Sequence, residues 1–184
     1  MKLIQQSIPD VLLIEPIVHR DKRGYFVETF RQDMLDQALG YKINFIQDNE
    51  SKSISRGILR GLHYQLPPFT QSKLIRVIKG NVLDVAVDIR RDSPTFGRHT
   101  TVELSEQNKR QLFLPRGFAH GFAVLSEGAI FSYKVDEYFS AEHNEGIAYN
   151  DKDIAVDWLL PEAEIILSEV DRNNLNLADK KNLL

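Results

Sequence analysis

The feature of this sequence that most constrains its fold is a series of short runs rich in Val, Ile, Phe and Tyr, each followed by turn-forming residues. These runs lie at residues 11–18, 25–30, 45–49, 58–65, 73–79, 82–89, 99–104, 110–114, 118–125 and 129–137. Glycine, proline and asparagine mark the turns, as in the strings KGN at 79–81 and PRG at 115–117. Many short strands at this spacing predict an all-β sandwich or barrel, and a jelly roll suits the length of the chain.

Helical character is confined to short stretches. Residues 31–39, closed by Gly40, have the clearest helical pattern, and residues 161–168 fit either a further short helix or a strand. No repeat, linker or low-complexity segment interrupts the chain, so we expect a single domain over residues 1–184.

Charge and composition exclude several classes of protein. Residues 1–134 contain 19 Lys and Arg against 14 Asp and Glu, whereas residues 135–184 contain 4 against 12. This positive excess is too small and dispersed for a nucleic-acid-binding surface, but it suits a small anionic ligand held by a few arginines. The acidic C-terminal part is typical of a solvated surface.

The absence of cysteine excludes disulfides, thiolate nucleophiles and Cys-based metal sites. The longest apolar runs have four residues, at 11–14 and 122–125, whereas a membrane helix needs about 20. The first residues, MKLIQQS, lack the apolar stretch of a secretory signal. We therefore expect a cytoplasmic protein that binds neither membrane nor nucleic acid.

Polar side chains fall on otherwise apolar strand faces. Alternation places Lys73, His120 and Tyr133 on the same faces as the apolar members of their runs, whereas His63 shares a more polar face. A single inward His or Tyr is commonly an ordinary core residue, but lysine is almost never buried without a partner or a function. Several such residues in one small barrel indicate a ligand site, since barrel mouths are common binding sites.

A His, Lys and Tyr set suits proton abstraction beside a carbonyl group. This reaction needs a base, a cation for the enolate oxygen and an acid on the other face. The sequence contains no nucleophile elbow, dinucleotide-binding glycine motif or Walker-type loop. Metal binding by His63 and His120 is the competing interpretation; no His-x-His pair supports it, and no Glu follows His63 at a ligand-like interval.

Several strings at matched spacing resemble one family. They are RGLHYQ (60–65), QSKLIR (71–76), DVAVDIR (84–90), SPTFG (93–97), PRGFAHGF (115–122), YK (133–134) and YFS (138–140). Together they resemble the dTDP-4-dehydrorhamnose 3,5-epimerase family over residues 8–171. The resemblance implies a cupin-type jelly roll (a double-stranded β-helix barrel) with a few short helices, a homodimer, and catalysis without metal or organic cofactor.

The resemblance also implies the roles of individual residues. The family's base corresponds to His63, oriented by Asp171; Lys73 corresponds to the lysine beside the keto oxygen, and Tyr133 to the proton donor. The aromatic residue that stacks on thymine corresponds to Phe139, where many relatives have tyrosine. The other substrate contacts correspond to Arg23, Glu28, Gln47, Asp48, Asn49, Arg60, His120, Tyr138 and Glu145.

Two local departures from the family pattern concern substrate binding. The spacing around Glu145 is shifted by one residue, and Val170 stands where relatives often have lysine.

The activity implied by the resemblance is inversion of C3 and C5 of dTDP-4-dehydro-6-deoxy-D-glucose to give dTDP-4-dehydro-L-rhamnose. An epimerase acting at only one carbon of another deoxysugar is the nearest alternative, because the same groups could serve a single centre. A metal-binding cupin and a non-catalytic sugar-nucleotide-binding module are alternatives of a different class.

Overall fold

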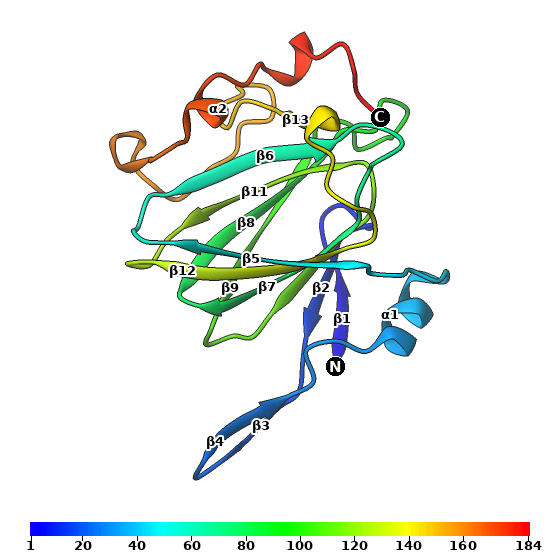
Figure 1. Ribbon diagram of the computed structural model, residues 1–184, viewed down its shortest axis with the longest axis vertical. Coiled ribbons are helices and arrows are strands. Elements are labelled where there is room, and N and C mark those ends of the chain that lie inside the picture. The colour runs from blue at the N-terminus through cyan, green and yellow to red at the C-terminus, as the bar shows by residue number, and fades with distance from the viewer.

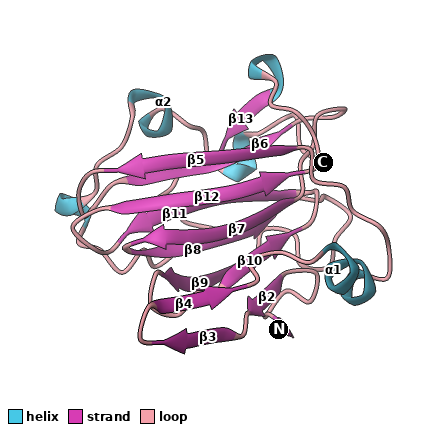
Figure 2. Cartoon of the chain, turned by 60° about the horizontal axis from the view of Figure 1, so that its bottom comes forward, coloured by secondary structure: helices cyan, strands magenta, loops and turns pink.

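Two antiparallel sheets form the body of the protein and enclose its main core between them (Figure 1). The computed structural model describes residues 1–184. One sheet contains, in spatial order, β1 (Lys2–Gln5), β2 (Leu12–Glu15), β10 (Gln111–Leu114), β7 (Lys73–Lys79), β12 (Ala129–Val135) and β5 (Gln47–Ser53). The other contains β13 (Asn144–Gly146), β6 (Leu59–Gln65), β11 (Phe118–Val124), β8 (Asn81–Asp88) and β9 (His99–Ser105). Figure 2 shows β5, β12 and β7 side by side in the first sheet.

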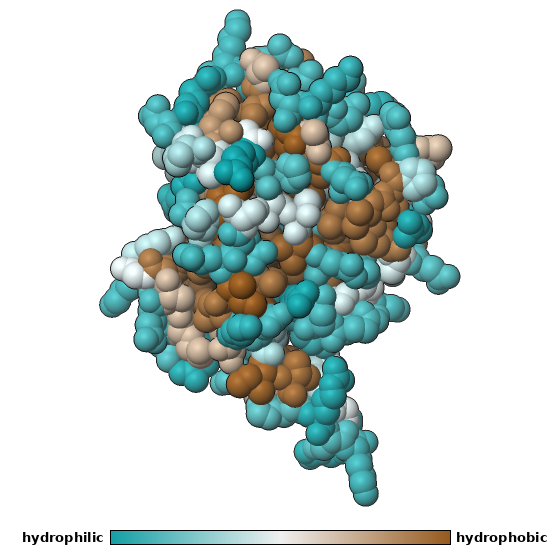
Figure 3. All heavy atoms as spheres, turned by 180° about the vertical axis from the view of Figure 1, so that it is seen from behind, coloured by the Kyte–Doolittle hydropathy of each residue, from teal (hydrophilic) through white to brown (hydrophobic).

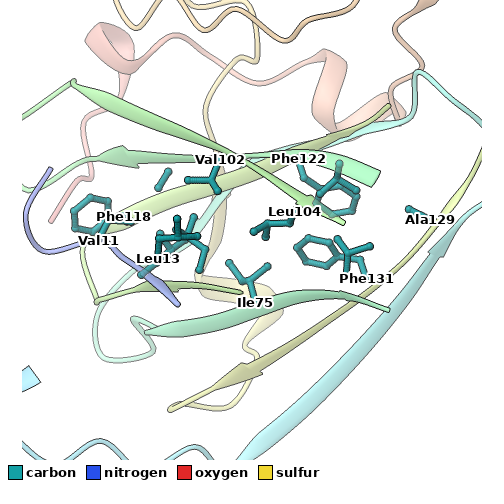
Figure 4. Packing of buried hydrophobic residues seen from close by; sticks show 14 of the residues in the cluster. Val11, Leu13, Ile75, Val102, Leu104, Phe118, Phe122, Ala129 and Phe131 are labelled. Carbon is teal, nitrogen blue, oxygen red and sulfur yellow. The ribbon is translucent and has the colours of Figure 1, made fainter. Parts of the chain in front are cut away.

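The space between the sheets is filled by apolar side chains from both (Figure 4). Phe122 of β11 and Phe131 of β12 stack with ring centroids 4.1 Å apart, which joins the two sheets at one end of the core. Stacked aromatic pairs contribute roughly 0.5–1.5 kcal/mol beyond the area that they bury. This pair also forms part of the wall of the site described below.

Each sheet has a cover on its outer face. Helix α1 (Gln32–Leu39) packs Leu35 against the first sheet and ends at Gly40, whose φ of 74° is the left-handed conformation that glycine favours at a helix end. The C-terminal segment covers the second sheet with Ile154, Trp158 and Leu177. This segment contains the single helical turn α2 (Glu169–Arg172) and 3₁₀ turns at Glu162–Glu164 and Leu177–Asp179, and a third 3₁₀ turn precedes it at Ala141–His143. Neither α-helix has the length or apolar character needed to traverse a bilayer.

A two-stranded hairpin extends away from the body (Figure 1). It consists of β3 (Val18–Asp21) and β4 (Gly24–Val27), and it pairs with neither large sheet. Tyr25 and Phe26 on this hairpin are exposed. A projecting hairpin with exposed aromatic rings has too little core of its own to be a stable unit.

The sequence predictions of an all-β jelly roll and of a helix near residues 31–39 are confirmed. Each of the ten apolar runs overlaps an observed strand, with ends displaced by up to four residues. Strands β1, β3 and β13 were not predicted. They are short, and β3 is mostly polar because it is exposed on the hairpin. The undecided stretch at 161–168 contains a 3₁₀ turn at Glu162–Glu164 and an isolated β-bridge from Ile166 to Ile58.

Candidate active site

A cavity of about 360 Å³ lies at one end of the space between the sheets, with α2 at its edge. Its lining residues are Ser51, Arg60, His63, Lys73, His120, Phe122, Phe131, Tyr133, Asn144, Ser168, Val170 and Asp171. Two hollows elsewhere are larger, at about 580 and 590 Å³, but neither contains a histidine. The smaller cavity is therefore the one with groups suited to acid–base chemistry.

A local irregularity in β6 directs two side chains into this cavity. His63 pairs with His120 of β11 and Arg60 pairs with Phe122, so two residues of β6 lie opposite Gly121 alone. The extra residue of this bulge allows Arg60 and His63, three positions apart, to face the same side. Gly61 has φ +121°, and a Cβ atom there would lie 2.5 Å from the Cα atom of Gly121. Only glycine fits at this position.

His63 is paired with a buried carboxylate. Its Nε2 lies 2.5 Å from Oδ1 of Asp171, a residue that is only 4% exposed. Ser168 caps α2: its hydroxyl donates to Oδ2 of Asp171 at 2.8 Å and accepts the Asp171 N–H at 3.1 Å. Burial acts to raise the pKa of Asp171, but the hydrogen bonds from His63 and Ser168 outweigh it and hold the pKa below its usual value. The pair thus leaves Nδ1 of His63 without a protein partner and gives the ring an anion to stabilise its protonated form.

The segment that carries Asp171 is attached to the second sheet on both sides. Before α2, Leu59 N–H donates to the carbonyl of Ile166 at 3.0 Å; after it, Ala148 N–H donates to the carbonyl of Leu175 at 2.9 Å. Residues 166–175 therefore form a strap between the start of β6 and the residues that follow β13, and this strap fixes Asp171 against His63.

Lys73 supplies a positive charge to the cavity. It begins β7, and its ammonium group makes no hydrogen bond or ion pair with the protein. Burial lowers the pKa of Lys73 to about 8, while the charge of Asp84 acts in the opposite direction. Most Lys73 side chains are consequently cationic at neutral pH, with donors free for a ligand.

Tyr133 lies on β12 with its ring 6.0 Å from that of Phe131. Its hydroxyl makes no hydrogen bond with the protein, and burial raises the pKa of Tyr133 despite the opposing charge of Arg60. The phenol therefore stays protonated at neutral pH and can donate into the cavity.

His120 is a buried residue of the site. Its Nε2 lies 3.1 and 3.0 Å from the two carboxylate oxygens of Asp84, which is fully buried. Burial lowers the pKa of His120, against the effect of Asp84. The ring also stacks against Phe131 at 5.9 Å.

Comparison with known proteins connects this geometry to a family. The model of the family described as dTDP-4-dehydrorhamnose 3,5-epimerase matches residues 5–179. A dTDP-4-dehydrorhamnose 3,5-epimerase of Shigella flexneri is 50% identical over 179 residues, which cover 97% of each chain. The chain belongs to the dTDP-4-dehydrorhamnose 3,5-epimerase family.

Solved structures of this epimerase family share the fold. One is a dTDP-6-deoxy-D-glucose-3,5-epimerase from Legionella pneumophila in complex with dTDP-4-keto-L-rhamnose; it is 46% identical, with a TM-score of 0.93, over 97% of this chain and 93% of that one. A more distant one is a 3′-monoepimerase from Streptomyces bikiniensis in complex with dTDP-quinovose. It is 32% identical, with a TM-score of 0.87, over 95% of this chain and 87% of that one.

The structure brings together the four predicted catalytic residues of the epimerase pattern. His63, Lys73, Tyr133 and Asp171 all line the cavity. Arg60 and His120, predicted as substrate contacts, line it as well. Their roles remain predictions.

The predicted contacts on β5 divide between the two faces of the strand. Asn49 pairs with Tyr133 and Gln47 with Val135, so both share the cavity-side face of β12. Asp48 lies on the other face, where Lys134 Nζ donates to it at 2.8 Å.

Tyr138 and Phe139 lie in an exposed loop with 59% and 58% of their surface accessible. Buried Gln65 anchors this loop by accepting the N–H of Ser140 at 2.6 Å and donating to the carbonyl of Tyr138 at 3.3 Å. Phe139 N–H donates to Oε1 of Gln47 at 3.3 Å. An aromatic ring is thus available next to Gln47 for a base to stack on.

Three further predicted substrate contacts lie away from the cavity within this chain. Glu145 pairs with Tyr64 on the outer face, where its carboxylate accepts from Lys180 Nζ at 2.7 Å. The neighbouring Asn144 lines the cavity instead. Arg23 lies at the tip of the β3–β4 hairpin with 90% of its side chain exposed, and the exposed Glu28 follows β4.

Four polar residues of the site were missed by reasoning from the sequence: Ser51, Asp84, Asn144 and Ser168. Ser168 had a recognisable signal, because Ser-x-x-Asp is a helix-capping pattern. Val170, at the position where relatives often have lysine, is exposed at the cavity edge. No group of three or more His, Asp and Glu side chains has an arrangement that could hold a metal ion.

Proposed function

We propose that the protein is an epimerase that inverts C3 and C5 of dTDP-4-dehydro-6-deoxy-D-glucose, giving dTDP-4-dehydro-L-rhamnose. The observation that carries this proposal is a carboxylate-oriented histidine, a lysine free of protein partners and a protonated tyrosine in one cavity. The names of the relatives support it, because two that are 46–50% identical act at both carbons.

Proton removal is assigned to His63. The keto group at C4 acidifies the protons on C3 and C5, so a histidine can remove them as a general base. Nδ1 of His63 is free to accept a proton, since Nε2 is bound to Asp171. The charge of Asp171 then stabilises the imidazolium that forms.

Lys73 and Tyr133 act on the enolate that proton removal produces. The ammonium group of Lys73 stabilises negative charge on the C4 oxygen, an effect that is strong where water is excluded. Tyr133 returns a proton from the opposite face and so inverts the centre. The same groups serve the second carbon once His63 has released its proton to solvent and Tyr133 has regained one, so no cofactor is required for either inversion.

We further propose that the active protein is a homodimer. Arg23 and Glu28 match the nucleotide contacts of the family pattern, yet they lie on or next to a hairpin that extends from its own barrel (Figure 1). Figure 3 shows apolar surface near the base of this hairpin, whose projecting end is hydrophilic. A second copy of the chain would cover that surface and receive the two side chains in its own cavity.

Mixing two inactive variants tests the dimer. Arg23→Ala and His63→Ala, co-expressed, should regain activity, because one site of each mixed dimer then has an intact barrel and an intact hairpin. Equal inactivity of the mixture and of the separate variants, with a monomeric mass in solution, would contradict the homodimer.

Turnover in D₂O tests the activity. Incubation with the dTDP-4-keto-6-deoxyglucose substrate should place deuterium at both C3 and C5, as mapped by NMR, and yield the L-configured product. Deuterium and inversion at one carbon only would identify a monoepimerase, as in the Streptomyces bikiniensis relative. Binding without any exchange would identify a sugar-nucleotide-binding module.

A further inference from the structure

A second histidine–aspartate pair lies directly beside the first. His63 and His120 are register partners across β6 and β11, and each is bound through Nε2 to a buried carboxylate. The carboxylate for His63 comes from α2, and that for His120 is Asp84 on β8. The mechanism proposed above gives Asp84 no role, although it is fully buried within the wall of the site.

The contacts of Asp84 define the hydrogen-bonding character of His120. Both carboxylate oxygens lie within 3.1 Å of Nε2, and a carboxylate can only accept, so Nε2 carries the hydrogen. Burial lowers the pKa of His120, which leaves the ring neutral at pH 7. Nδ1 is then an unprotonated acceptor that no protein group engages. Such an atom suits a sugar hydroxyl rather than a keto oxygen, because the keto oxygen needs a donor.

The same carboxylate acts on Lys73 by its charge. Lys73 has no ion pair, and the charge of Asp84 opposes the effect of burial on its pKa. The other titratable groups of the cavity are Arg60 and His63 from β6, His120 from β11, Tyr133 from β12 and Asp171 from α2. Both carboxylates are bound to a histidine, and Asp84 is the one whose charge acts on the pKa of Lys73.

We propose that Asp84 is a positioning residue for the epimerase reaction: it fixes His120 as an acceptor for a sugar hydroxyl, and its negative charge supports the Lys73 ammonium group. This inference rests on the proposed function of the cavity. Asp84 touches no substrate itself and acts through its two neighbours.

The test is Asp84→Asn in the full-length protein, which keeps the size of the side chain and removes its charge. Lys73 must be protonated to stabilise the enolate, so activity falls as pH rises through its pKa of about 8. If loss of the charge lowers that pKa by about one unit, the protonated fraction at pH 8 drops from about half to about a tenth. We therefore expect Asp84→Asn to lose about fivefold more kcat at pH 8 than at pH 6, because the alkaline limb moves to lower pH.

Asp88→Asn is the matched control. Asp88 is also fully buried on β8, but it binds Arg90, Ser93 and Thr95 away from the cavity. Its variant should be less stable while the pH profile of kcat keeps its position. A loss in Asp84→Asn that is equal at pH 6 and pH 8, or the same shift in Asp88→Asn, would overturn the proposal.

Two measurements do not depend on activity. In the wild-type protein, ¹⁵N NMR of His120 should show hydrogen on Nε2 and none on Nδ1; a protonated Nδ1 would overturn the proposal even if Asp84→Asn fails to fold. The titration of the Lys73 side chain, followed by ¹³C NMR, should move to lower pH in Asp84→Asn. These results stand whether or not the protein inverts both carbons, so failure of the proposed function is distinguishable from failure of this inference.

Discussion

Tyr133→Phe separates proton return from proton removal. The tyrosine hydroxyl makes no hydrogen bond with the protein, and the ring that remains keeps its contact with Phe131. The substitution therefore removes no intramolecular hydrogen bond, whose net value is about 1 kcal/mol. We expect the free energy of unfolding to change by less than about 1 kcal/mol, so any loss of activity reports on chemistry.

The kinetic effect follows from the protonation state of the phenol. Burial raises the pKa of Tyr133, so wild-type protein has its donor throughout the neutral range. Loss of a general acid typically costs a factor of about 10²–10⁴, which corresponds to about 3–5 kcal/mol in the barrier to inversion. Abstraction by His63 does not use the phenol, so exchange of substrate protons with solvent should continue.

The assay is deuterium incorporation at C3 and C5 in D₂O, followed by NMR together with the configuration of the sugar. The variant should exchange protons while it accumulates little inverted product. Tyr41→Phe, an exposed tyrosine outside the cavity, is the control and should behave as wild type. Equal losses of exchange and inversion in Tyr133→Phe would refute the reasoning and make the tyrosine a group that positions the sugar.

Four further outcomes are expected. His63→Ala should abolish exchange at both carbons, a loss of about 10²–10⁴ in rate, and exchange near the wild-type rate would assign the base elsewhere. Phe139→Ala should weaken dTDP binding by about 1–3 kcal/mol in calorimetry while Phe139→Tyr stays near wild type; equal affinity of the alanine variant would place the base stack at another ring. Activity should persist after exhaustive dialysis against EDTA. A loss of activity that added iron or zinc restores would contradict metal-free catalysis. Gly61→Ala should lower the free energy of unfolding, measured by urea denaturation, by several kcal/mol, since a Cβ atom there meets Gly121 Cα at 2.5 Å and φ is +121°; an unchanged free energy would show that β6 shifts freely.

Strand alternation placed Lys73, His120 and Tyr133 correctly, because each lies in a regular strand with one face in the core. It could not place Arg60 on the same side as His63, since a bulge breaks the period of two within β6. The cue was Gly61, but a glycine in a strand does not reveal which neighbour turns inward.

The sequence pattern alone could not predict hydrogen bonds between side chains that are far apart in the chain. Asp84 looked like a polar residue in a strand of valines, and its partner His120 is 36 residues away. Asp171 was assigned through the family resemblance, and the capping by Ser168 explains why a short helical turn can hold it firmly. The shift around Glu145 was a real signal, because the structure places Asn144, not Glu145, in the cavity.

The strap at residues 166–175 has a consequence for how the site comes into being during synthesis. His63 and Asp171 are separated by 108 residues, so ribosomes adding about 5–20 residues per second make the aspartate about 5–20 s after the histidine. The last barrel strand, β13, ends at Gly146, so for the final 25 residues of that interval, about 1–5 s, every strand has been made and the imidazole still has no carboxylate to orient it. A nascent or C-terminally shortened chain can therefore contain the strands that form most of the cavity wall while its His63 has no carboxylate partner. Orientation of the base is thus among the last events in the maturation of the protein.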